Sequence, residues 1–108
     1  MGGSIALHAV AGGLPVDAVA DLSGPDGWFE GSSIADDVRR IRVPVLLAYD
    51  PGDDPMTFRT ARRLVTRWPQ RVRFVRADEG HGWDIPADLD GTLTAEGRAL
   101  LQFVRSAG

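Results

Sequence analysis

A nearly continuous apolar run from Val43 to Tyr49 constrains the fold of this chain more than any other segment. Charged residues precede the run, and Asp50-Pro51-Gly52, a sequence that favours a turn, follows it. A strand that is apolar on both faces is typical of the middle of a parallel sheet that helices cover on both sides. The sequence therefore predicts a central parallel strand over residues 43–49.

Segments with helical and strand periodicity alternate along the rest of the chain. In chain order we expect a helix over residues 2–11, a strand over 16–23, a short helix starting near 33, the central strand, a helix over 57–68, a strand over 72–77 and a helix over 94–104. This alternation favours right-handed crossovers between parallel strands. The predicted fold class is α/β, a three-layer arrangement of a parallel sheet with helices on both faces.

The composition is that of an ordinary globular domain and excludes several classes of function. The 108 residues are 44% hydrophobic and 25% charged, with a formal net charge of −3. Neither this charge nor the few aromatic residues favour binding to nucleic acid or to an anionic membrane. The chain has no cysteine, so it cannot form a disulfide or a thiolate metal site. Its apolar stretches are shorter than the roughly 18 residues of a membrane helix, and without a signal peptide we expect a cytoplasmic protein.

An acid and a histidine each follow an expected strand. Asp53 comes shortly after the central strand, and His81 lies between two glycines after the strand over 72–77. In an open parallel sheet the functional loops lie beyond the carboxyl ends of the strands, and neighbouring loops can join a carboxylate to an imidazole. The acid would fix the tautomer of the imidazole, which would take the proton of a serine hydroxyl. We therefore predict Asp53 and His81 as a catalytic acid and base.

Other interpretations of these loops remain open at this point. Asp50 and Asp54 compete with Asp53 for the acid role, although Asp54 directly precedes Pro55 and would also serve as the cap of the next helix. A plain turn would explain either loop. The three aspartates lack the alternating oxygen ligands and the distal glutamate of a calcium loop, so we predict no metal site.

Together these segments resemble the C-terminal part of an α/β-hydrolase, in particular dienelactone-hydrolase-like serine hydrolases, over all of residues 1–108. Two segments resemble the last two catalytic loops of the family. They are Pro44-Val45-Leu46-Leu47 with Asp53, and Gly80-His81-Gly82. Met1-Gly2-Gly3-Ser4-Ile5 resembles the residues just after the nucleophile in elbows of the GxSMGG type.

The resemblance implies a serine hydrolase that cleaves a carboxylic ester or similar acyl bond through an acyl-enzyme, without a cofactor. It also places the nucleophilic serine immediately before Met1. We therefore expect a chain that lacks the N-terminal strands and the nucleophile elbow of the domain, and that is inactive in isolation because the acid and histidine have no serine to activate.

The remaining polar and aromatic residues have simpler interpretations. Gly2-Gly3-Ser4-Ile5-Ala6 approximates GxSxG, but no strand precedes it, so we predict that Ser4 is a packing residue of a helix. His8 is predicted to be a surface or packing residue, and Ser23 a turn residue that would also suit the exit of a strand. Trp28-Phe29 and Trp83 are candidates for a pocket wall, and Trp83 equally for the core.

Three functional hypotheses follow. The first is the serine hydrolase described above, acting on a small-molecule ester. The second is a non-catalytic α/β-hydrolase-like binding or interaction module. In the third, a separate N-terminal polypeptide supplies the serine, because the strand over 16–23 would otherwise be an apolar sheet edge that recruits partners or self-associates.

Overall fold

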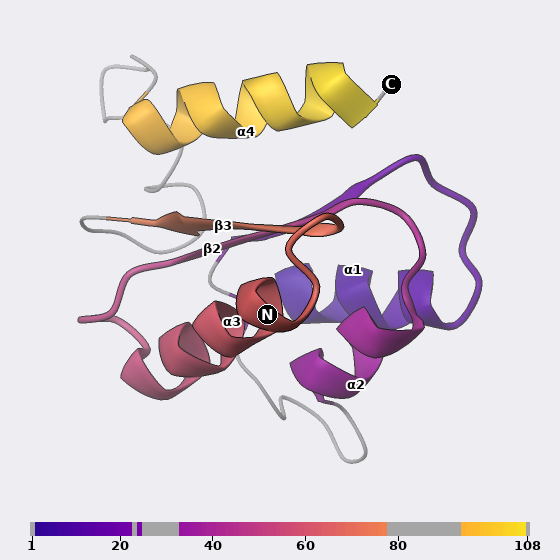
Figure 1. Cartoon of the computed structure of the whole chain (residues 1–108), viewed down its shortest axis with the longest axis horizontal. Coiled ribbons are helices and arrows are strands. Elements are labelled where there is room, and N and C mark those ends of the chain that lie inside the picture. The colour runs from indigo at the N-terminus through magenta and orange to yellow at the C-terminus, as the bar shows by residue number, and fades with distance from the viewer. Residues whose placement is uncertain (1, 23, 25–32, 78–93, 108) are drawn as a thin grey trace.

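The predicted alternation of helices and strands is present in the computed structural model, which describes residues 2–22, 24, 33–77 and 94–107. Within these residues the chain forms a small α/β domain with a three-stranded parallel sheet (Figure 1). The elements are α1 (Gly2–Ala11), β1 (Val19–Leu22), α2 (Ile34–Arg40), β2 (Val45–Tyr49), α3 (Pro55–Arg67), β3 (Val72–Arg76) and α4 (Ala95–Ala107). Their order agrees with the order predicted from the sequence.

The central position of β2 is confirmed. The strands lie in the order β1-β2-β3, with Val19 opposite Val45 and Val45 opposite Val72. All five residues of β2 are buried, as expected for a strand that is paired on both edges and covered on both faces.

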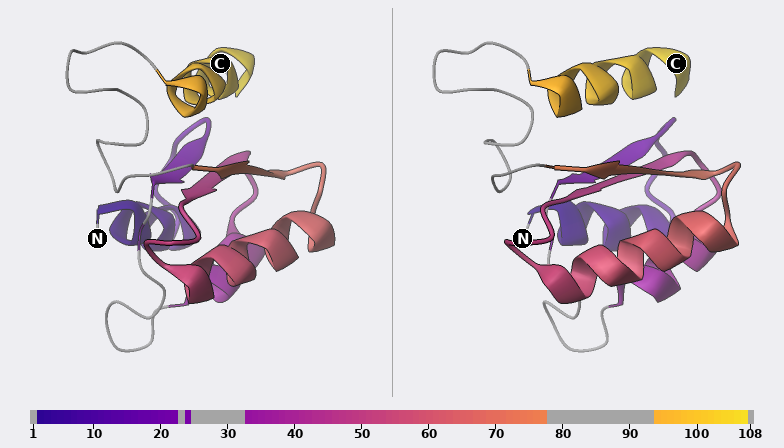
Figure 2. Two further views of the ribbon diagram at one scale, coloured as in Figure 1. Left: turned by 90° about the vertical axis from the view of Figure 1, so that its left-hand side faces the viewer. Right: turned by 60° about the vertical axis from the view of Figure 1, so that its left-hand side comes forward.

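Side chains of β2 alternate between two apolar clusters on opposite faces of the sheet. Figures 1 and 2 show α1, α2 and α3 on one side of the sheet and α4 on the other. The cluster on the side of α1, α2 and α3 contains Leu7, Val19, Ile34, Val38, Ile41, Val45, Leu47, Tyr49, Phe58, Ala61, Leu64 and Val72. The cluster on the side of α4 contains Leu46, Ala48, Ala77 and Phe103.

The ends of α1 and α2 follow from local sequence signals. At the end of α1, Gly13 has φ +111°, and the N–H groups of Gly13 and Leu14 donate to Val10 O at 3.0 Å and Ala9 O at 3.1 Å. These are the bonds of a Schellman motif, in which glycine takes the left-handed position. At the start of α2, the Ser33 hydroxyl accepts from the Asp36 N–H at 3.3 Å as an N-cap.

Several bounds differ from the expected ones: β2 begins at Val45 rather than at residue 43, α3 begins at Pro55 rather than at residue 57, and α4 ends at Ala107 rather than at residue 104. β1 begins at Val19, whereas we predicted a strand from residue 16, and Val16 is 37% exposed. On α4, Phe103 is buried, whereas Val104 is 55% exposed. A sheet of three strands offers α4 a narrow surface, and Phe103 fills the buried position next to it. Among the described residues, no helix is both long enough and apolar enough to cross a membrane.

Candidate functional site

Three parts of the chain meet at the carboxyl edge of the sheet. Because all strands are parallel, the ends of β1, β2 and β3 lie along the same edge. The Ala77 N–H donates to Tyr49 O at 2.9 Å and joins the ends of β3 and β2. The first turn of α1 lies beside the end of β1, where a Cβ atom on Gly3 would overlap the Asp21 carboxylate. The sequence predicts the functional loops at this same edge.

The turn after β2 gives Asp50 and Asp54 defined structural roles. An oxygen of the Asp50 carboxylate accepts from the Gly52 N–H at 2.8 Å, and Asp50 O accepts from Asp53 N at 3.1 Å and Asp54 N at 3.2 Å. Asp54 is the N-cap of α3, and its Oδ1 accepts from the Thr57 N–H at 3.1 Å. The interpretation of Asp54 as a helix cap is thereby confirmed.

Asp53 lies in this same turn, directly after Gly52, and its side chain is exposed. Asp53 stays our predicted acid, with Asp50 and Asp54 as the alternatives. His81 lies in segment 78–93, outside the described residues, so the contact between Asp53 and His81 stays a prediction. Ser23, Trp28-Phe29 and Trp83 also lie outside them.

A buried polar cluster that was not predicted from the sequence lies where β1, β2 and α1 meet. Asp21 on β1 is 0% exposed. Its Oδ1 accepts from the Gly24 N–H at 2.7 Å, and its Oδ2 lies 2.6 Å from the hydroxyl of Tyr49 on β2. The same hydroxyl lies 2.6 Å from Gly24 O, so its single hydrogen serves two acceptors. We refer to Asp21, Gly24 and Tyr49 as the Asp21 cluster.

The Asp21 cluster fixes the start of α1 against the carboxyl edge. A Cβ atom on Gly24 would overlap both the Asp21 carboxylate and the backbone of Ser4, so only glycine permits this close approach. Ser4 is buried in α1, which confirms its prediction as a packing residue. One sequence signal could have found Asp21: it lies two positions after Val19, so both side chains lie on the same face of β1. A buried carboxylate on that face requires hydrogen-bond partners.

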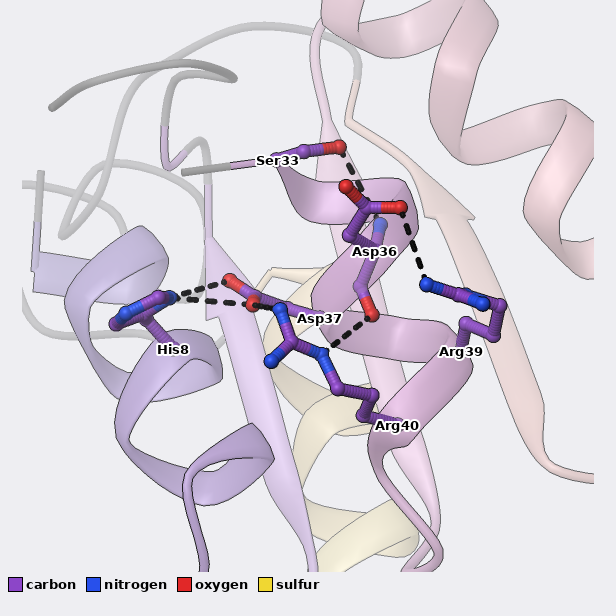
Figure 3. A network of polar contacts seen from close by, with 6 residues as sticks. All are labelled: His8, Ser33, Asp36, Asp37, Arg39 and Arg40. Carbon is purple, nitrogen blue, oxygen red and sulfur yellow. Dashed lines mark hydrogen bonds and ion pairs between the residues drawn. The ribbon is translucent and has the colours of Figure 1, made fainter. Parts of the chain in front are cut away.

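A second acid–histidine contact joins α1 to α2 (Figure 3). His8 Nδ1 lies 3.1 Å from Asp37 Oδ1 and 3.2 Å from Asp37 Oδ2. The Asp37 side chain is 4% exposed and that of His8 44%, and Arg40 Nη2 lies 3.7 Å from the same carboxylate. The prediction of His8 as a surface or packing residue agrees with its half-exposed ring, but its partner, 29 residues away, was not predicted. This contact stabilises the packing of the two helices.

Among the described residues, no group of three or more histidine, cysteine, aspartate or glutamate side chains is arranged to hold a metal ion. No protein-family model matches the chain, and neither a curated protein nor a solved structure matches it significantly.

Proposed function

We propose that this chain provides the acid and the histidine of a serine hydrolase that cleaves a carboxylic ester or a similar acyl bond. One observation supports the proposal above the others: the start of α1, the turn that contains Asp53 and the end of β3 all lie at one edge of a parallel sheet. In the proposal this α/β domain corresponds to the C-terminal part of a three-layer α/β-hydrolase fold.

Each residue has a defined role in the proposed reaction. Asp53 accepts a hydrogen bond from the His81 ring, fixes its tautomer and stabilises the imidazolium that forms. His81 takes the proton from a serine hydroxyl as the hydroxyl attacks the ester carbonyl, and returns it to the leaving alcohol. The resemblance assigns the serine to a residue before Met1. Backbone N–H groups at the start of α1 would then stabilise the negative charge on the carbonyl oxygen.

The pairing of Asp53 with His81 is directly testable because the chain has two histidines. An NMR titration of the ring protons gives one curve for His81 and one for His8, which contacts Asp37 and serves as the internal reference. A carboxylate next to an imidazole favours its protonated form. We expect Asp53→Asn to move the midpoint of the His81 titration to lower pH and to leave the His8 curve unchanged.

Asp54→Asn is the matched control, since asparagine caps a helix as well as aspartate does and the start of α3 is preserved. If Asp54→Asn moves the His81 curve and Asp53→Asn does not, the acid is Asp54. If neither substitution moves it, the proposed acid–histidine pair does not exist.

Hydrolysis of p-nitrophenyl acetate tests the reaction itself. The 108-residue chain is compared with the same chain extended through the upstream reading frame, each with and without His81→Ala. We expect activity in the extended protein alone, and a loss of more than about a thousandfold on His81→Ala. Absence of turnover in both proteins, together with saturable ligand binding, would support the non-catalytic binding module instead.

A further inference from the structure

The outward face of α3 carries a concentration of positive charge. Arg59, Arg62, Arg63 and Arg67 are exposed, and the helix contains no acidic residue. The opposite face of the helix is buried in the core. Arginines three and four positions apart are neighbours on a helix surface and repel one another. The charge is therefore crowded on one face of a chain whose formal net charge is −3.

Part of this face forms a shallow, open depression. Arg59, Arg62, Arg63 and Thr66 line a surface depression of about 420 Å³, which we call the α3 depression. Within the described part of the chain, none of its three arginines forms an ion pair with a carboxylate. The arginines of α2 differ, because Arg39 and Arg40 lie 3.6 and 3.7 Å from aspartates of their own helix (Figure 3).

Two arginines lie close to Trp68 at the end of α3. The guanidinium groups of Arg67 and Arg71 lie over the Trp68 ring, 5.5 and 5.1 Å from its centroid. Arg71 Nη1 also donates to Val38 O at 2.7 Å, and burial together with repulsion from Arg42 lowers the pKa of Arg71.

The side chains of the α3 depression favour an anion with several oxygen atoms. A guanidinium group offers up to five N–H donors in a planar fork that matches a phosphate bidentately, and it offers no acceptor. Three such groups match the three negative charges of a diphosphate. Residues 59–66 span about 10 Å of helix axis, which suits a compact anion better than an extended acidic peptide.

We propose that the α3 depression binds a small molecule through a diphosphate group or another phosphate group of similar charge. The proposal is independent of the hydrolase function, because the depression lies on the outward face of α3 and uses neither Asp53 nor His81. Inorganic pyrophosphate, without a metal ion, is the probe. In an NMR titration of backbone amides we expect saturable shifts centred on residues 59–66.

Two double variants with the same net charge decide whether binding is local. Arg62→Gln with Arg63→Gln removes two donors from the depression, and we expect affinity for pyrophosphate to fall by about tenfold or more. Arg73→Gln with Arg105→Gln removes two exposed arginines from β3 and α4, and we expect a change of less than about threefold. Circular dichroism confirms that both variants are folded.

The proposal is overturned if both double variants weaken binding equally, because the chain would then respond only to net charge. It is also overturned if the amide shifts lie elsewhere, or if no saturable shift occurs at low salt. Citrate, a tricarboxylate of similar charge, tests the phosphate assignment. Binding at least about tenfold weaker than that of pyrophosphate supports it, and equal binding contradicts it.

Discussion

At the scale of single residues, the Asp21 cluster is the polar feature on which the stability of the carboxyl edge depends. We expect Asp21→Ala to lower the free energy of unfolding by about 2–4 kcal/mol, because the Gly24 N–H and the Tyr49 hydroxyl lose a buried acceptor. Asp21→Asn keeps an oxygen for one of these donors, so we expect a smaller loss. Urea denaturation measures both changes.

A loss below about 0.5 kcal/mol for Asp21→Ala would mean that water or other groups replace the carboxylate.

The contrast with Asp54 explains what the sequence could predict at this scale. Asp54 bonds to a residue three positions away, so its cap follows from local pattern. Asp21 and Tyr49 are 28 positions apart, and only the pairing of β1 with β2 brings them together.

At the scale of elements, the end of α1 depends on which of two adjacent glycines takes the left-handed conformation. We expect Gly13→Ala to destabilise the protein by about 1–2 kcal/mol, because a Cβ atom is strained at φ +111°. Gly12→Ala is the matched control, since its Cβ atom would make only ordinary contacts, at 3.5 Å from His8 O and Ala9 O. Equal unfolding midpoints for the two variants in urea would contradict this account of the helix end.

The sequence predicted the order and type of the elements because periodicity and turn residues are local signals. It extended β1 too far toward its start, because a strand ends where its partner ends, and β2 begins only at Val45. Of the candidate site, it identified Asp54 as a cap but missed the Asp21 cluster.

At the scale of the whole molecule, β1 is an edge of the sheet and lies near exposed apolar side chains. Within the described residues β1 pairs with β2 alone, and Ile5, Leu14 and Val16 are exposed. Unpaired edges recruit other strands. We therefore expect self-association that increases with concentration in sedimentation velocity experiments, and a shift toward monomer in Val16→Lys.

Val104→Lys places the same charge on an exposed valine of α4 and serves as the control, for which we expect no shift toward monomer. If the chain sediments as a monomer at every concentration, the edge of β1 does not cause self-association. Equal effects of the two lysines would instead indicate a general response to net charge.

Tyr49 is the single tyrosine of the chain, and its hydroxyl lies within the Asp21 cluster. Its vibrational bands in ultraviolet resonance Raman spectra therefore arise from one phenol at one known place, distinct from the bands of the three tryptophans. The protein thus contains an intrinsic optical reporter for the junction of β1, β2 and α1, which needs neither a label nor a substitution.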